Sequence, residues 1–148
     1  MPKVPLTVTV ITLNEAANID ACLASVDFAG EVIVVDSGST DDTAEIARGR
    51  GARVVTRDWP GYSAQKNFAA DQASHDWILS VDADERVTPA LADEVRRIVE
   101  RGFLQADFNF RGVELVPHIG RKGYFAESHL LVGAFHREGT ILEVNVVR

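Results

Sequence analysis

The stretch that decides the fold is Glu31-Val32-Ile33-Val34-Val35-Asp36, which is followed by Ser37-Gly38-Ser39-Thr40-Asp41-Asp42. Four β-branched, apolar residues stand between two carboxylates in the first segment, a pattern typical of a strand that is buried on both faces. The segment from Ser39 to Asp42 resembles a capping box and predicts a short helix that runs through Arg48. Strand, polar turn and helix in this order are the repeating unit of an α/β protein.

The same unit recurs on both sides of this stretch. Upstream, residues 6–13 form a β-rich apolar run, and Asn18 can cap a helix whose apolar residues have helical spacing. Downstream we expect strands over 52–56 and 77–81, a helix from Ser63 through Ala73, and a helix that begins at Thr88-Pro89 and ends at Gly102. This alternation predicts a doubly wound α/β fold with a mostly parallel sheet.

The pattern weakens after Gly102. Residues 106–110, 113–116 and 140–147 alternate like strands, whereas the glycine-containing region from 117 to 139 predicts loops. We therefore expect a single domain over 1–148, in which 1–102 is a binding half and 103–148 a shorter second part.

Length and composition narrow the class of protein. The chain has 148 residues, of which 46% are apolar, enough for one compact domain with a core. Its net charge of −7 argues against a nucleic-acid partner, because phosphate backbones require clustered Lys and Arg. Cys22 is the single cysteine, so no internal disulfide can form, and its place on an apolar helix face indicates a core residue.

No stretch of the sequence predicts a signal peptide or a membrane span. The start is not an apolar signal segment, and no apolar run approaches the roughly 20 residues of a transmembrane helix. We expect a cytoplasmic protein, and a peripheral association with the inner face of the cell membrane stays open.

Polar clusters follow three of the expected strands. Asn14-Glu15 comes after the first strand, the segment from Asp36 to Ser39 after the second, and the segment from Asp82 to Glu85 after the fourth. Because the carboxyl ends of parallel strands share one edge of a sheet, these clusters predict a ligand site at that edge.

The acidic cluster suggests a metal ion. If the chain is extended, Asp82 and Asp84 lie on the same side, since strand side chains alternate. Paired carboxylates suit Mg²⁺ or Mn²⁺, ions that keep waters and share the phosphates of a substrate. The alternative is a solvated acidic turn before the next helix, and the buried strand that precedes the pair favours the metal site.

The other polar residues each have two interpretations. Asp36 could bond a base or a ribose hydroxyl, or it could be a turn residue that bonds its own backbone. Ser37 and its neighbours could likewise form only a turn and a cap. Lys66, in the first turn of an expected helix, could contact a diphosphate or lie in an exposed polar turn.

Two common nucleotide-binding motifs are absent from the sequence. It contains no Gly-x-x-x-x-Gly-Lys-Ser/Thr loop, and no Gly-x-Gly-x-x-Gly follows the first strand. Its four histidines do not have metal-ligand spacing. These absences count against a P-loop enzyme and a dinucleotide-dependent oxidoreductase.

Together, the motifs resemble the ordered signature of family 2 glycosyltransferases of the GT-A type. Three segments carry the resemblance: Thr12-Leu13-Asn14-Glu15, Ile33 through Thr43, and Leu79-Ser80-Val81-Asp82-Ala83-Asp84-Glu85. A fourth, Trp59-Pro60-Gly61-Tyr62-Ser63-Ala64-Gln65-Lys66-Asn67, is similar to the bacterial branch that builds lipopolysaccharide core. The resemblance covers roughly residues 6 to 100, and Leu13 departs from the lysine that the family often has.

The resemblance implies an NDP-sugar donor, a divalent ion (Mg²⁺ or Mn²⁺) and inversion at the anomeric carbon. It places the nucleoside at Thr12, Asn14, Glu15 and Asp36, with Ser37 in the same donor-binding set. It places Lys66 and Asn67 near the diphosphate or ribose, Asp82 at the ribose and metal, and Asp84 as the principal metal ligand.

The resemblance also implies a single displacement, in which a carboxylate takes the proton of an acceptor hydroxyl. Glu127 is the candidate base, with Glu114 and Asp107 as rivals, and the acceptor is a glycan or lipid-linked hydroxyl in lipopolysaccharide or other cell-envelope synthesis. Family members are usually longer, so we also consider a fragment or a non-catalytic sugar-nucleotide-binding module that transfers sugar poorly. A nucleotidyltransferase is disfavoured because no Gly-rich, Arg-containing loop follows the first strand.

Overall fold

The structure, a computed structural model, describes residues 2–101, 118–119, 132–135 and 140–144. Strands and helices alternate through its first hundred residues, which confirms the predicted α/β order. The elements are β1 (Val4–Thr12), α1 (Ile19–Ser25), β2 (Ala29–Asp36), α2 (Thr43–Gly49), β3 (Arg53–Thr56), α3 (Tyr62–Asp71), β4 (Trp77–Asp82), α4 (Pro89–Arg101), β5 (His118–Ile119), β6 (Val132–Phe135) and β7 (Thr140–Val144).

The described strands form one sheet with the order β3-β2-β1-β4-β6-β7-β5. β3, β2, β1 and β4 run parallel, whereas β6, β7 and β5 pair antiparallel along the other side of β4. The chain crosses from β3, on one side of the parallel part, to β4 on the other, so β1 is the central strand with β2 and β4 on its two sides. This arrangement is the predicted α/β fold with a mostly parallel sheet.

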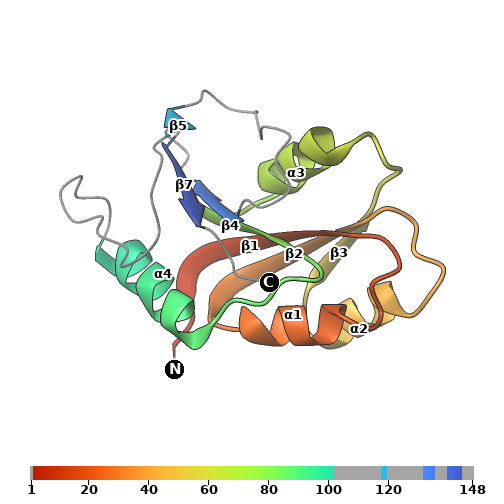
Figure 1. Cartoon of the computed structure of the whole chain (residues 1–148), viewed down its shortest axis with the longest axis horizontal. Helices are drawn as coiled ribbons and strands as arrows, with labels where there is room; N and C mark the ends of the chain where they lie inside the picture. Colours follow the sequence, from red (N-terminus) through yellow and green to blue (C-terminus); the bar gives the residue numbers. More distant parts are fainter. Residues whose placement is uncertain (1, 102–117, 120–131, 136–139, 145–148) are drawn as a thin grey trace.

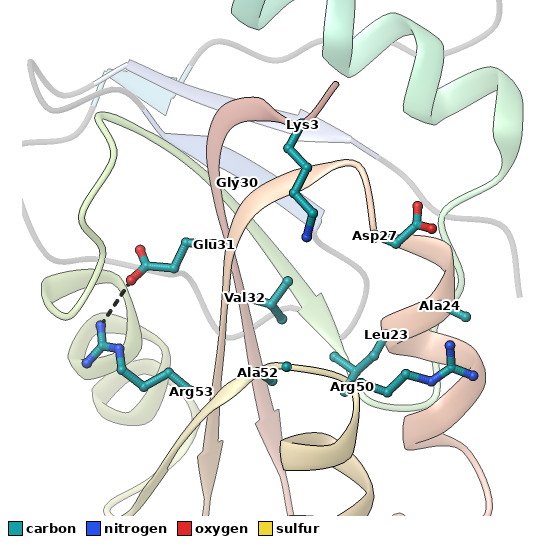
Figure 2. A pocket seen from close by; sticks show the side chains of 11 residues that line it. Lys3, Leu23, Ala24, Asp27, Gly30, Glu31, Val32, Arg50, Ala52 and Arg53 are labelled. Atoms are coloured by element: carbon teal, nitrogen blue, oxygen red, sulfur yellow. Dashed lines mark hydrogen bonds and ion pairs between the residues drawn. The ribbon is translucent and has the colours of Figure 1, made fainter. Parts of the chain in front are cut away.

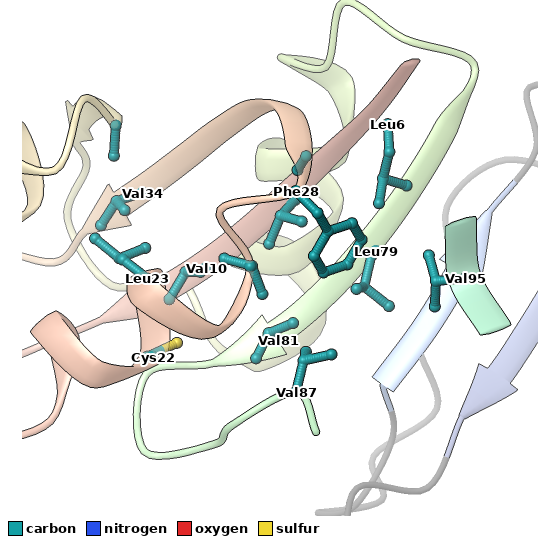
Figure 3. Packing of buried hydrophobic residues seen from close by; sticks show 14 of the residues in the cluster. Leu6, Val10, Cys22, Leu23, Phe28, Val34, Leu79, Val81, Val87 and Val95 are labelled. Atoms are coloured by element: carbon teal, nitrogen blue, oxygen red, sulfur yellow. The ribbon is translucent and has the colours of Figure 1, made fainter. Parts of the chain in front are cut away.

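Helices cover both faces of the sheet (Figure 1), with α1, α2 and α4 on one face and α3 on the other. Alternation along β1 explains the two layers, because its even-numbered residues point to one face and its odd-numbered residues to the other. Leu6, Val8 and Val10 are fully buried in the larger core, which also contains Cys22 of α1 and Val95 of α4 (Figure 3). Burial of each such aliphatic side chain stabilises the fold by about 1.5–3 kcal/mol.

The smaller core lies under α3. It contains Ile11 of β1, Ile33 and Val35 of β2, and Ala69 of α3, with Phe68 packed against it. The two cores are the reason that each central strand is apolar on both faces, as the sequence predicted.

The helix ends agree only in part with the prediction. Pro89 is the first residue of α4, and the Thr88 hydroxyl accepts the Leu91 N–H at 3.2 Å, as expected for a capped helix with proline at its first position. The predicted cap at Ser63 is wrong, because α3 already begins at Tyr62 after Gly61, whose φ of 109° ends the preceding extended chain. The Asn18 side chain does not cap α1 and instead donates to Glu15 Oε2.

The region expected to be loops contains two strands, so that part of the prediction was wrong. β5 and β6 lie inside it, and Ala134 and Phe135 of β6 pair with Leu79 and Ile78 of β4. Pairing with a distant strand supplies hydrogen bonds that a local pattern containing Gly133 cannot reveal. β7 confirms the expected strand after residue 140, and the expected strands over 106–110 and 113–116 lie outside the described residues.

Candidate functional site

The predicted site residues meet at the carboxyl edge of the parallel strands. Thr12, at the end of β1, pairs with Asp36 at the end of β2, and its neighbour Ile11 pairs with Asp82 at the end of β4. Asp36 lies on the same side of the sheet as Val34, which packs against the layer of α1 and α2. Asp82 lies on the opposite side, towards α3.

The loops that follow β1 and β2 are bonded to each other through Asn14. Its backbone N–H donates to the Ser39 hydroxyl at 2.8 Å, and its side-chain oxygen accepts the Thr40 N–H at 2.8 Å. Asn14 has a φ of 52°, a left-handed conformation that asparagine tolerates better than most residues. The predicted donor residue Asn14 therefore orders the loop, and its exposed side-chain oxygen already accepts a hydrogen bond from Thr40.

Two further hydrogen bonds extend this loop contact. The Glu15 N–H donates to the Thr43 hydroxyl at 2.9 Å, and the Ala16 N–H donates to Asp41 Oδ2 at 3.2 Å. Hydrogen bonds from the Thr43 hydroxyl and N–H to Asp41 lower the pKa of that carboxyl. The start of α2 is thus ordered by the bonds between Asp41 and Thr43, and not by the capping box that was predicted over Ser39 to Asp42. Glu15 is held in place through its backbone N–H.

Asp36 is buried, and its carboxylate is already bonded to the turn that follows it. It accepts the N–H groups of Gly38 at 3.1 Å and Ser39 at 2.9 Å, and also the Ser39 hydroxyl. This is the geometry of a turn residue, the second of the two interpretations that the sequence left open. Next to it, the Thr12 hydroxyl is buried and has no hydrogen-bond partner within the part of the chain that is described.

On the α3 side, Gln65 joins three segments, whereas the sequence placed it in the motif from Trp59 to Asn67 without giving it a role. Its side chain is fully buried, and its amide donates to the Ser37 hydroxyl at 3.1 Å and to the Arg57 carbonyl at 3.2 Å. The Arg57 guanidinium donates back to Gln65 Oε1 at 3.3 Å and lies over the Phe68 ring. The only local signal for this role was the place of Gln65 directly before Lys66.

Lys66 forms an ion pair with Asp82, with 2.9 Å between Nζ and Oδ1. Only 12% of the Lys66 side chain is exposed, so the exposed-turn interpretation of this residue is wrong. Asn67 follows it in α3 and is half-buried. This ion pair joins the motif that contains Lys66 to the motif that contains Asp82. The two residues are 16 positions apart in the sequence.

The acidic motif after β4 is a tight turn, so the predicted extended geometry of Asp82-Ala83-Asp84 is wrong. The strand ends at Asp82, whose carbonyl accepts the Glu85 N–H at 2.9 Å, and the Asp82 N–H donates to Glu85 Oε2 at 2.9 Å. Ala83 is buried at the turn, whereas Asp84 is exposed. Burial, aided by the charges of Asp82 and Asp84, raises the pKa of Glu85 against the effect of its hydrogen bond.

The residues of this turn fit a divalent ion that is shared with a ligand. Asp82 Oδ1 is buried and forms no directed hydrogen bond with the described residues, and Asp84 is exposed beside it in the sequence. Within the described residues no group of three or more His, Cys, Asp or Glu side chains could hold a metal. Two carboxylates that leave positions for water and phosphate are the usual protein contribution to a Mg²⁺ site.

The predicted base is not placed by the structure. Glu127 and its rivals Glu114 and Asp107 lie outside the described residues, so each stays a prediction.

A groove lies at the opposite, amino-terminal end of β2 (Figure 2), with a volume of about 270 Å³. Its guanidinium groups are paired: Arg53 lies 3.4 Å from Glu31 and Arg50 lies 2.6 Å from Asp20. Because these charges are neutralised and the groove is at the edge away from Asp36 and Asp82, we assign the site to the carboxyl edge.

The fold and the site define an α/β domain that binds its ligand at the carboxyl ends of parallel strands, with a carboxylate pair at the end of β4. The chain belongs to glycosyl transferase family 2, whose model matches residues 7–140. The resemblance drawn from the sequence is thereby confirmed.

Two curated relatives and one solved structure illustrate the similarity. An uncharacterized glycosyltransferase of Rickettsia bellii is 51% identical over 90 residues, which are 60% of this chain and 31% of the relative. The lipopolysaccharide core biosynthesis glycosyltransferase LpsC of Rhizobium meliloti is 41% identical over 98 residues, 63% of this chain and 36% of LpsC. The crystal structure of TarS from S. aureus superposes with a TM-score of 0.53 at 29% identity, covering 68% of this chain and 20% of TarS.

The chain thus spans about a third of the length of the curated relatives that it matches. None of the helices in the described part of the chain has the length and apolar character that a membrane crossing requires.

Proposed function

We propose that this chain carries the donor site of an inverting, metal-dependent glycosyltransferase that moves a sugar from an NDP-sugar to a hydroxyl of a glycan or lipid-linked acceptor. The reaction would serve lipopolysaccharide or other cell-envelope synthesis, in the cytoplasm or at the inner face of the cell membrane. Family membership supports the reaction class, and the similarity to the lipopolysaccharide core biosynthesis glycosyltransferase LpsC, at 41% identity, supports the pathway.

The observation that carries the proposal is the turn at the end of β4. It presents Asp82 and Asp84 at the same sheet edge as Thr12 and Asp36, and Lys66 reaches this edge from α3. A carboxylate pair with a nearby lysine suits a diphosphate, since the carboxylates can hold an ion and the ammonium can pair with phosphate oxygens.

Each part of the site has a distinct task in this proposal. The loop contacts through Asn14 and the turn at Asp36 would shape the nucleoside pocket. The buried Thr12 hydroxyl, which has no hydrogen-bond partner among the described residues, could bond a polar group of the ligand. Asp84 and Asp82 would hold the ion, and Lys66 and Asn67 would lie along the diphosphate or ribose. When bound, the ion would stabilise the negative charge of the leaving diphosphate.

Proton removal from the acceptor requires a base on the acceptor side. We keep Glu127 in this role, with Glu114 and Asp107 as rivals, on the strength of the family resemblance. A general base contributes roughly 10²–10⁴-fold to the rate, so a chain without a working base would bind the donor and transfer little sugar.

Thermal melting with nucleotide sugars tests the proposal. UDP-sugars and ADP-sugars are added with Mn²⁺ or with a chelator, and a ligand at a hundred times its Kd should stabilise the native state by about 2.7 kcal/mol. For a chain of this size the gain corresponds to roughly 5–10 °C. Asp84→Ala should abolish the Mn²⁺-dependent part of the shift and keep the melting temperature of the free protein.

The matched control is Asp93→Ala, which removes an exposed aspartate of α4 and should keep the full shift. Equal nucleotide-sugar affinity in Mn²⁺ and in chelator, measured by calorimetry, would show that the metal assignment is wrong.

A further inference from the structure

The ion pair between Lys66 and Asp82 has a consequence for the order of binding at this site. Asp82 Oδ1 is buried and forms no directed hydrogen bond with the described residues, and the Lys66 ammonium lies 2.9 Å away. A buried carboxylate oxygen requires a charge or hydrogen-bond partner, because its desolvation is otherwise uncompensated. In this structure the ammonium of Lys66 supplies that partner.

The Asp82 carboxylate is also one of the two proposed ligands of a divalent ion at the acidic turn, and a third of its side chain is exposed there. The neighbouring carboxylates of Asp84 and Glu85 are close enough to influence each other electrostatically, and so is the Lys66 charge. A divalent cation on the Asp82 carboxylate and an ammonium paired with that carboxylate repel each other. Binding of the ion should therefore weaken the ion pair with Lys66.

We propose that Lys66 occupies the metal position on Asp82 in the absence of the ion, and that the ion displaces it. The displaced ammonium then pairs with the donor diphosphate, so the same lysine competes with the metal and assists the donor. This inference rests on the proposed donor-binding function and adds to it a defined exchange of cations at one carboxylate.

The exchange predicts opposite effects of one substitution. Lys66→Met removes the competitor, so Mn²⁺ alone should bind roughly two- to fivefold more tightly, the range that a partly exposed ion pair supports. The same variant should bind UDP in the presence of Mn²⁺ more weakly than the parent. Lys66→Arg keeps a competing cation and should not tighten Mn²⁺ binding.

Lys3→Met is the matched control. Lys3 is exposed before β1, at the end of the sheet opposite the acidic turn, so its loss removes an equal charge without removing the competitor. Titration calorimetry gives both affinities, and circular dichroism verifies that each variant is folded.

Amine labelling of the unmodified full chain tests the displacement directly. An acetylating reagent is applied in chelator, in Mn²⁺ alone and in Mn²⁺ with UDP, and mass spectrometry compares the labelling of Lys66 with that of Lys3. We expect Mn²⁺ alone to increase Lys66 labelling, because the amine leaves the carboxylate, and UDP with Mn²⁺ to decrease it again.

Each failure has its own meaning. Unchanged Lys66 labelling in Mn²⁺, together with Mn²⁺-dependent UDP binding, would overturn the exchange and leave the proposed function intact. Absence of Mn²⁺ binding in both the parent and Lys66→Met would overturn the exchange as well, and absence of any Mn²⁺-dependent nucleotide binding would count against the function itself.

Discussion

The side-chain amide of Gln65 donates a hydrogen bond to the Ser37 hydroxyl across 3.1 Å, which ties the first turns of α3 to the turn after β2. Gln65 is fully buried and also bonds the Arg57 carbonyl at the end of β3. One side chain thus connects the carboxyl ends of two strands with the helix that presents Lys66. We regard Gln65 as a positioning residue of the donor site.

Replacement of Gln65 by methionine should destabilise the protein by about 1–3 kcal/mol, because buried partners lose their hydrogen bonds while the volume stays similar. Urea denaturation measures this loss. The same substitution at Gln72, which is half-buried at the other end of α3, should cost clearly less. Equal losses at the two positions would contradict the network.

Substitution of Asn14 tests the left-handed loop conformation. Asn14→Gly and Asn14→Ala both lose the bond from Thr40, but only alanine meets the full steric penalty at a φ of 52°. We therefore expect Asn14→Ala to be less stable than Asn14→Gly by about 1 kcal/mol. If alanine were the more stable of the two in thermal unfolding, this loop geometry would be incorrect.

Asp36→Ala should weaken binding of free nucleotide and leave Mn²⁺ affinity unchanged. β1 separates β2 from β4 in the sheet, and Asp36 and Asp82 lie on opposite sides of it, so we do not expect Asp36 to ligate the ion at the acidic turn. The variant also removes the acceptor of the Gly38 and Ser39 N–H groups, and bonds to a charged group are worth about 1.5–3 kcal/mol. Calorimetric titration with UDP and with Mn²⁺ separates the two effects, and equal nucleotide affinity of variant and parent would refute the assignment.

Glu31 should make stability depend on pH. Burial acts to raise the pKa of this carboxyl, but the hydrogen bonds from the Ser74 N–H and from the Thr7 and Ser74 hydroxyls, with the charge of Arg53, outweigh it and lower the pKa. A lowered folded-state pKa contributes stability that is present above the unfolded value, here about 4.5, and is lost as pH falls through the folded value.

Glu31→Gln should therefore be less stable than the parent at pH 7, by about 1.5–3 kcal/mol, and the difference should shrink below pH 4.5. Urea unfolding at several pH values gives this comparison. Asp93→Gln changes an exposed carboxyl and serves as the control. A difference between parent and Glu31→Gln that is independent of pH would show that the charge of Glu31 does not stabilise the fold.

Several elements could be predicted because their signals are local. The apolar runs of β1, β2 and β4 identify strands buried on both faces, and Thr88-Pro89 marks the start of α4 through capping and a preset φ. The position of the polar clusters at one edge follows from the parallel order alone. Cys22 is a buried core residue, as its helical position indicated, and burial raises the pKa of its thiol to about 12.

The errors and omissions share a different cause. β6 depends on pairing with β4, more than 50 positions earlier in the sequence. Its four residues, which include Gly133, are too few to show the alternation of apolar and polar residues that identifies a strand. The extended geometry expected for Asp82 and Asp84 fails because Glu85 closes a turn by bonding both backbone groups of Asp82. Gln65 had no periodic or charge signal, since its importance comes from partners in two other segments.

The sequence by itself determined the order of strands and helices through α4, the edge at which the polar residues gather, and the family to which the chain belongs. Backbone propensity, apolar period and motif spacing are local properties. Only the tertiary structure decided which polar atoms are already engaged. Asn14 and Asp36 bond the loops around them, Lys66 pairs with Asp82, and the Thr12 hydroxyl is left without a partner among the described residues. Such pairings depend on register and on distances between segments far apart in the chain, and these are set only when the sheet and its two helical layers pack together.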